Sequence, residues 1–159
     1  MRTHLLPARL LLLAVITIVA ACQTVDTNAP TRAAMQQAIT QERPGNYFIG
    51  RRMYKVDYKM WGWIRKPGEQ WTTAQLVMLN EHKCLAPDRQ QNKIGSDNNY
   101  EYRLEGYFSG QTVYEPASDN FYPEFVLLKA SVLSTSPVNI YRYKEELDPN
   151  YRILTPPNV

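Results

Sequence analysis

His82 and Cys84 are the pair of residues whose types could support nucleophilic catalysis in this sequence. Residues two apart in a β-strand lie on one face, so an imidazole there could deprotonate the neighbouring thiol. Close neighbours on one face are poorly arranged to share a substrate, however, and no run of glycines or small residues surrounds them to form an oxyanion hole. We therefore predict no catalytic residue and no cofactor. A small envelope enzyme that uses His82 and Cys84 is the alternative.

Acidic side chains are dispersed along the chain, and a polar segment, residues 84–99, offers oxygen ligands from Asp88 and Asp97, with Glu101 just after it. Their spacing does not match that of an EF-hand calcium loop. The sequence has two histidines, which argues against a multi-histidine metal site. We predict a solvated loop that uses Asn and Asp in turns, and no metal site.

A strip of alternating residues is the strongest candidate for a binding surface. If residues 59–66 form a strand, two cations and two tryptophans share one face, namely Lys59, Trp61, Trp63 and Arg65. Facing outward, this strip could stack on sugar rings, contact lipid headgroups or hold a partner chain. Facing inward, the tryptophans would belong to the core and the cations would reach its edge. We favour the inward arrangement, because burial of tryptophan is common, and keep the four residues as binding candidates.

The N-terminus has the anatomy of an export signal. Arg2 and Arg9 precede an apolar run over residues 10–21. This run is shorter than the about 20 apolar residues that a membrane-spanning helix needs. A core helix is a poor interpretation, because the run lies at the extreme N-terminus and a polar stretch follows it.

The end of this run, Val19-Ala20-Ala21-Cys22, resembles the lipobox of bacterial lipoproteins. The resemblance implies that residues 1–21 are a signal peptide and that Cys22 carries the lipid that anchors the chain to a membrane. Gln23 stands where this family places an aspartate for retention in the inner membrane. The resemblance therefore favours the outer membrane, facing the periplasm. The whole chain looks like an uncharacterised family of bacterial lipoproteins without a known activity.

The remaining chain predicts a lipidated tether with a short helix over 22–45, an all-β domain over 46–143 and an extended tail over 144–159. Met35, Ala38 and Ile39 form the apolar stripe of a helix over about 32–42, which Pro44 and Gly45 end.

About six strands without an intervening helix predict a small antiparallel barrel or a sandwich, with an OB-like layout among the options. The strands are expected at residues 47–56, 59–66, 71–79, 100–105, 111–115 and 125–133, with turns at Pro67-Gly68 and Ser109-Gly110 and a loop at 116–120. A helix is the alternative for 71–79, where Thr72 and Gln75 could form a capping box.

The net charge limits the class of partner. The formal charge of +3 falls to +1 when Arg2 and Arg9 leave with the signal. Nucleic-acid-binding domains carry a much stronger basic character, so we expect no nucleic-acid partner. We predict a membrane-anchored envelope lipoprotein with a non-enzymatic binding or structural role, whose partner is an envelope protein or a glycan. An OB-like nucleic-acid or glycan binder is the further alternative.

Overall fold

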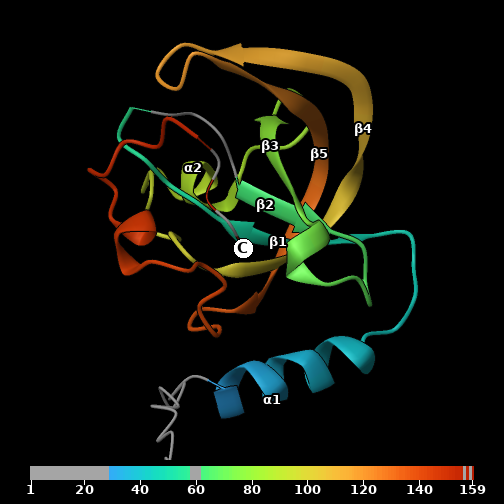
Figure 1. Cartoon of the computed structure of the whole chain (residues 1–159). Coiled ribbons are helices and arrows are strands. Elements are labelled where there is room, and N and C mark those ends of the chain that lie inside the picture. The colour runs from blue at the N-terminus through green and yellow to red at the C-terminus, as the bar shows by residue number, and fades with distance from the viewer. Residues whose placement is uncertain (1–28, 58–61, 156, 158) are drawn as a thin grey trace, which may run out of the picture.

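The chain forms a small β-barrel that follows an N-terminal helix (Figure 1). The computed structural model describes residues 29–57, 62–155, 157 and 159. The signal segment, Cys22, Lys59 and Trp61 therefore lie outside the described residues. The elements are α1 (Ala29–Thr40), β1 (Phe48–Arg52), β2 (Gly62–Arg65), the 3-10 helix η1 (Trp71–Thr73), β3 (Gln75–Asn80), α2 (Pro87–Gln90), β4 (Glu101–Glu115), β5 (Asn120–Ser134) and the 3-10 helix η2 (Lys144–Leu147).

The strands close into a barrel in the order β1-β2-β3-β5-β4, with β4 pairing back onto β1. The pairs are antiparallel except for β3 and β5, which run parallel through Met78–Glu124 to Asn80–Val126. This confirms the predicted all-β barrel with a short N-terminal helix. Five closed strands that include one parallel pair have the layout of an OB-like barrel rather than of a sandwich.

The strand count is five among the described residues, where the sequence predicted about six. The difference arises at Ser109-Gly110, which lies inside the single long strand β4. Gly110 has a φ of +82°, and the register with β5 shifts between Phe108 and Thr112, as in a β-bulge. The β4–β5 turn lies instead at residues 116–119, where the loop was expected.

Two further segments differ from the expected pattern. Residues 71–79, predicted as one strand, begin with η1 and become β3 only at Gln75. Thr73 N–H donates to the Gln70 carbonyl at 3.1 Å, which closes the 3-10 turn and seats Trp71 in the core. The expected loop over 84–99 contains the four-residue helix α2, which has Pro87 at its first position, where a missing N–H costs nothing.

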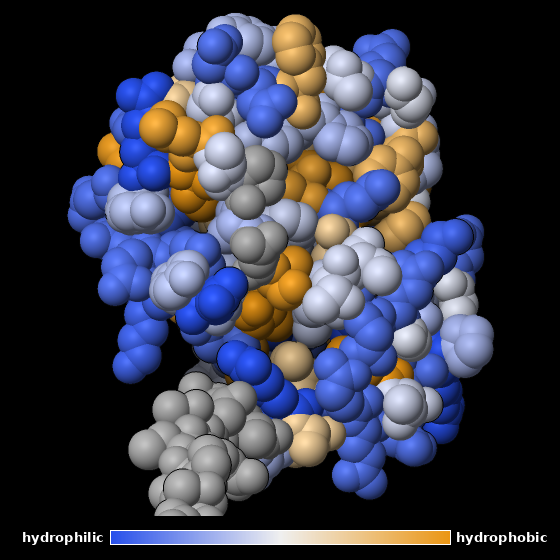
Figure 2. Space-filling view, in the orientation of Figure 1, coloured by the Kyte–Doolittle hydropathy of each residue, from blue (hydrophilic) through white to orange (hydrophobic). Residues whose placement is uncertain are grey.

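Apolar side chains pack in two layers, one inside the barrel and one on its outer face. The interior core contains Ile64, Val77, Ala86, Tyr102, Leu104, Phe125 and Leu127. The outer core contains Ile39, Ile49, Met53, Trp63, Trp71, Leu76, Tyr122, Ile140, Tyr141 and Ile153. All four residues of β2 are buried because both of its faces are covered. In Figure 2, hydrophilic residues occupy most of the visible face and separate the hydrophobic patches.

Segments at both ends of the described chain supply part of the outer core. α1 contributes the buried Ile39 and the half-buried Met35, two members of the predicted stripe, while Ala38 is exposed. We expected an extended tail over residues 144–159, and the structure instead has η2 there, with Ile153 buried against the barrel. No helix of the described residues is long and apolar enough to cross a membrane.

Candidate functional site

His82 and Cys84 lie just after β3, and their side chains contact different residues rather than each other. His82 Nδ1 lies 2.7 Å from the side-chain oxygen of Asn80, which also accepts the His82 backbone N–H at 3.0 Å. The Cys84 Sγ lies 3.5 Å from the Leu85 carbonyl oxygen and 3.6 Å from Gln90 Nε2, with the residue half-buried beside the interior core. The structure therefore shows no imidazole–thiol hydrogen bond at this place.

The acidic residues of the polar segment neutralise an arginine buried in the barrel. Arg52 of β1 donates through Nη2 to Asp88 at 2.9 Å and through Nε to Asp97 at 3.1 Å. The Tyr102 hydroxyl also donates to Asp97, at 2.9 Å, and burial raises the pKa of that hydroxyl. These carboxylates hold the segment onto the barrel. In the described part of the chain, no three His, Cys, Asp or Glu side chains form a group that could hold a metal ion.

The strip proposed from the sequence is described only at Trp63 and Arg65. Trp63 is 7% exposed and belongs to the outer core, and Arg65 is 3% exposed. The Arg65 guanidinium makes a two-pronged ion pair with Glu42, with both N–O distances 2.6 Å, and lies 4.5 Å from the centre of the Trp71 ring. Both residues therefore take the inward arrangement that we favoured, and neither offers an exposed binding surface.

Arg51 is a second cation held against Trp71. Its guanidinium lies 5.2 Å from the centre of that ring and donates to the Glu101 carboxylate at 2.8 Å and to the Val138 carbonyl at 2.7 Å. Burial lowers the pKa of Arg51, and the nearby Glu101 opposes that shift. The contact with Val138 fastens the segment after β5 onto the barrel, directly beside Trp71.

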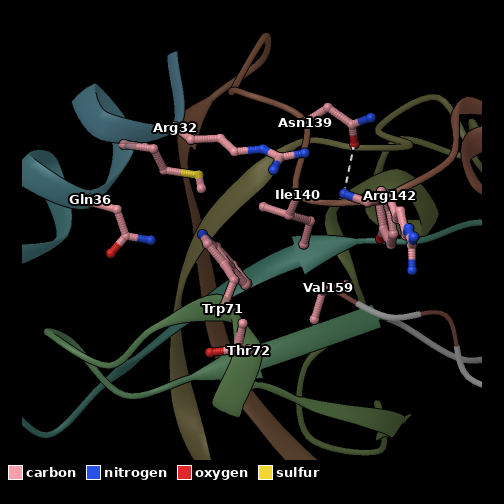
Figure 3. A pocket seen from close by; sticks show the side chains of 10 residues that line it. Arg32, Gln36, Trp71, Thr72, Asn139, Ile140, Arg142 and Val159 are labelled. Atoms are coloured by element: carbon pink, nitrogen blue, oxygen red, sulfur yellow. Dashed lines mark hydrogen bonds between the residues drawn. The ribbon is translucent and has the colours of Figure 1, made fainter. Parts of the chain in front are cut away.

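On the solvent side of the outer core, two cavities that share lining residues form one groove, which we call the α1 groove; Figure 3 shows the larger cavity. The larger has a volume of about 470 Å³ and the smaller about 260 Å³. Both cavities are lined by Arg32 of α1 and by Asn139, Tyr141 and Arg142 from the segment after β5. The larger cavity is also lined by Met35, Gln36, Trp71, Thr72, Ile140 and Val159, and the smaller by Thr31, Val138 and Lys144.

The α1 groove combines a cationic rim with an apolar and aromatic floor. Arg32, Arg142 and Lys144 supply the charges, and Trp71 and Ile140, both buried, supply floor. The described lining residues include no aspartate or glutamate. In Figure 3, the side chain of Arg32 extends from α1 toward Asn139. A groove of this size and make-up suits a small anionic ligand with an apolar part.

Sequence reasoning missed this groove because its walls come from four distant parts of the chain. Residues 31–36, 71–72, 138–144 and 159 share no spacing pattern, and only the folded chain brings them together. Arg142 and Lys144 flank Tyr143 in a segment that follows the last strand, which is the one local signal that could have singled them out. Clustering of cations with aromatic residues in an irregular segment is a weak indicator of binding.

Comparisons with known proteins leave the function to be argued from these residues alone. No family model, no curated protein and no solved structure matches the chain.

Proposed function

We propose that this protein is a lipid-anchored lipoprotein of the bacterial cell envelope, whose barrel is a non-enzymatic binding module. The observation that carries the anchor is the sequence Val19-Ala20-Ala21-Cys22 at the end of an apolar run. Acyl chains contribute about 0.8 kcal/mol for each buried CH₂, so one chain binds a membrane reversibly and two or three hold it stably. Gln23 in place of aspartate supports the outer membrane, with the barrel in the periplasm.

The position of α1 supports a barrel held close to the membrane. Six residues, 23–28, separate Cys22 from the first residue of α1. Because a chain spans at most about 3.6 Å per residue, the start of the helix lies within about 25 Å of the lipid-bearing cysteine. A binding module on so short a tether meets ligands and partners at the membrane surface.

The α1 groove supports binding as the role of the barrel. Its larger cavity has a volume of about 470 Å³, and cationic, amide and aromatic side chains converge on it. The partner class in this proposal is an envelope component, either a protein or a glycan. Nucleic acid is disfavoured, because the formal charge of the chain falls to +1 without Arg2 and Arg9, far from the strongly basic character of nucleic-acid-binding domains.

The test of the anchor is the replacement Cys22→Ser in the full chain, with Cys84→Ser as the matched control. Cys22→Ser should release the protein from the membrane fraction or leave it unprocessed, and Cys84→Ser should remain membrane-bound. Mass spectrometry of the mature N-terminus should show an acylated Cys22. An unmodified cysteine, cleavage at another residue, or membrane attachment that survives Cys22→Ser would refute the anchor.

A further inference from the structure

The exposed cations of the α1 groove differ in their ion pairing from the buried and half-buried arginines of the structure. Arg51, Arg52, Arg65 and Arg89 each form an ion pair with a carboxylate, at Glu101, at Asp88 and Asp97, at Glu42 and at Glu81 respectively. None of the ion pairs that the structure describes includes Arg142 or Lys144. The groove therefore concentrates positive charge in a protein whose overall charge is close to balanced.

The polar groups beside these cations are arranged as hydrogen-bond donors. Asn139 Oδ1 accepts the Tyr141 backbone N–H at 3.0 Å, the contact that Figure 3 marks with a dashed line. This contact orients the amide and leaves its Nδ2, which only donates, without a hydrogen bond among those that the structure describes. Arginine and lysine donate only as well. An anion with several acceptor oxygens satisfies such a set, and phosphate suits the planar arginine fork best.

The location of the groove narrows the source of such a ligand, and this step rests on the proposed lipid anchor. Arg32 is the fourth residue of α1 and follows Cys22 by ten residues. The tether thus holds the cationic rim near the bilayer surface, where lipid headgroups present phosphate groups. The apolar floor formed by Trp71 and Ile140 suits the glycerol or upper acyl part of such a molecule.

We propose that the α1 groove binds a phosphate ester, with Arg142, Lys144 and Arg32 holding the phosphate oxygens and Asn139 donating a hydrogen bond. A headgroup of the membrane to which the chain is anchored is the first source of this phosphate, and a soluble phosphate ester of the envelope is the second. The cavity volume of about 470 Å³ accommodates a glycerol phosphate unit.

The test compares Arg142→Gln/Lys144→Gln with Lys93→Gln/Lys129→Gln, which removes the same charge at exposed sites outside the groove. Each purified mature protein is titrated with glycerol phosphate in neutral detergent micelles and then reconstituted in vesicles of phosphatidylcholine alone or with phosphatidylglycerol. The measurements are calorimetric affinity and hydrogen exchange of the backbone over residues 138–142. Each cation near a phosphate-bearing surface contributes roughly a fivefold factor in affinity, so the groove double variant should bind about 25-fold more weakly.

A headgroup ligand is supported if phosphatidylglycerol vesicles protect residues 138–142 from hydrogen exchange in the control variant but not in the groove variant. The same pattern with glycerol phosphate alone supports a soluble ester. The proposal is overturned if neither phosphate source protects the segment, or if both double variants lose affinity equally. The titration in micelles does not depend on lipidation, so a failed anchor and an empty groove give different results.

Discussion

Arg52→Met tests whether the buried arginine and its two carboxylates hold the barrel together. The Arg52 side chain is 2% exposed, and its partners Asp88 and Asp97 are 0% and 5% exposed at their side chains. Methionine fills similar apolar volume but removes the guanidinium, so two carboxylates stay buried without their cation. Removing one partner of a buried ion pair costs about 3–5 kcal/mol. Domains of this size are stable by about 5–15 kcal/mol, so the loss is a large fraction of the total.

The assay is urea unfolding of the purified protein, followed by tryptophan fluorescence. With a slope of about 2 kcal/mol per molar urea, a loss of about 4 kcal/mol moves the midpoint down by about 2 M without changing the slope. The control is Lys129→Met, because Lys129 and Glu105 are exposed and 3.8 Å apart. An exposed pair of this kind contributes less than about 1 kcal/mol, so the control midpoint should hardly move.

The same variant has an expected pH signature. Burial on its own would raise the pKa of Asp88, but the Gly95 N–H and Arg52 outweigh it, so that pKa lies below its ordinary value. The resulting stabilisation is complete above the unfolded pKa of about 3.9 and disappears as the pH falls through the lower folded pKa. In Arg52→Met, burial dominates and the carboxylate takes up a proton more readily. The stability gap should therefore be widest near pH 7 and narrow below about pH 5. A gap under about 1 kcal/mol at pH 7, or one that widens in acid, would refute the reasoning.

Three other replacements have expected outcomes. Trp63→Ala should cost about 3–5 kcal/mol in unfolding free energy by thermal denaturation, because the indole fills the outer core; a nearly unchanged melting temperature would mean that this side chain faces outward. Lys55→Met should speed hydrogen exchange over residues 144–148, because two backbone carbonyls there accept from the ammonium at 2.5 and 2.7 Å, whereas unchanged exchange would show that other contacts hold the segment. Gly62→Ala should abolish soluble expression, because its Cβ would lie 2.0 Å from a β1 carbonyl oxygen. Gly68→Ala shares the backbone strain of a positive φ, here +82°, but its Cβ meets no atom within 4 Å, so it should fold, and equal expression of the two would contradict this.

The sequence predicted the barrel because its strands obey local rules, and it failed where tertiary contacts decide. The strand expected at residues 100–105 is part of β4, where Tyr102 and Leu104 alternate with polar residues, and both are buried in the interior core. The dipeptide Ser109-Gly110 is compatible with either a turn or a β-bulge. It forms a bulge here because β4 pairs with β5 on both sides of it. Gly62 lies where the backbone of β1 comes close, since a Cβ there would meet the Arg51 carbonyl, and a glycine in a strand permits such an approach.

The candidate site was less accessible to prediction. Alternation placed Trp63 and Arg65 on one face, which the structure bears out, since they lie together in the layer around Trp71. Whether that face is covered depends on residues 138–153, which no local pattern connects to β2. The α1 groove is lined partly by residues of the outer core, so its residues could be recognised only once the positions of the outer-core residues were known.

The outer core therefore links the stability of the barrel to its candidate binding site. Trp71 contacts Arg51 and Arg65 in the outer core and also lines the α1 groove. The segment after β5 is tied to Arg51 through the Val138 carbonyl and supplies Asn139 and Arg142 to the groove a few residues later. An OB-like barrel ordinarily leaves this outer face open for ligands. Here the chain covers that face with its own side chains, and the candidate binding surface lies on the outer side of these side chains, next to α1.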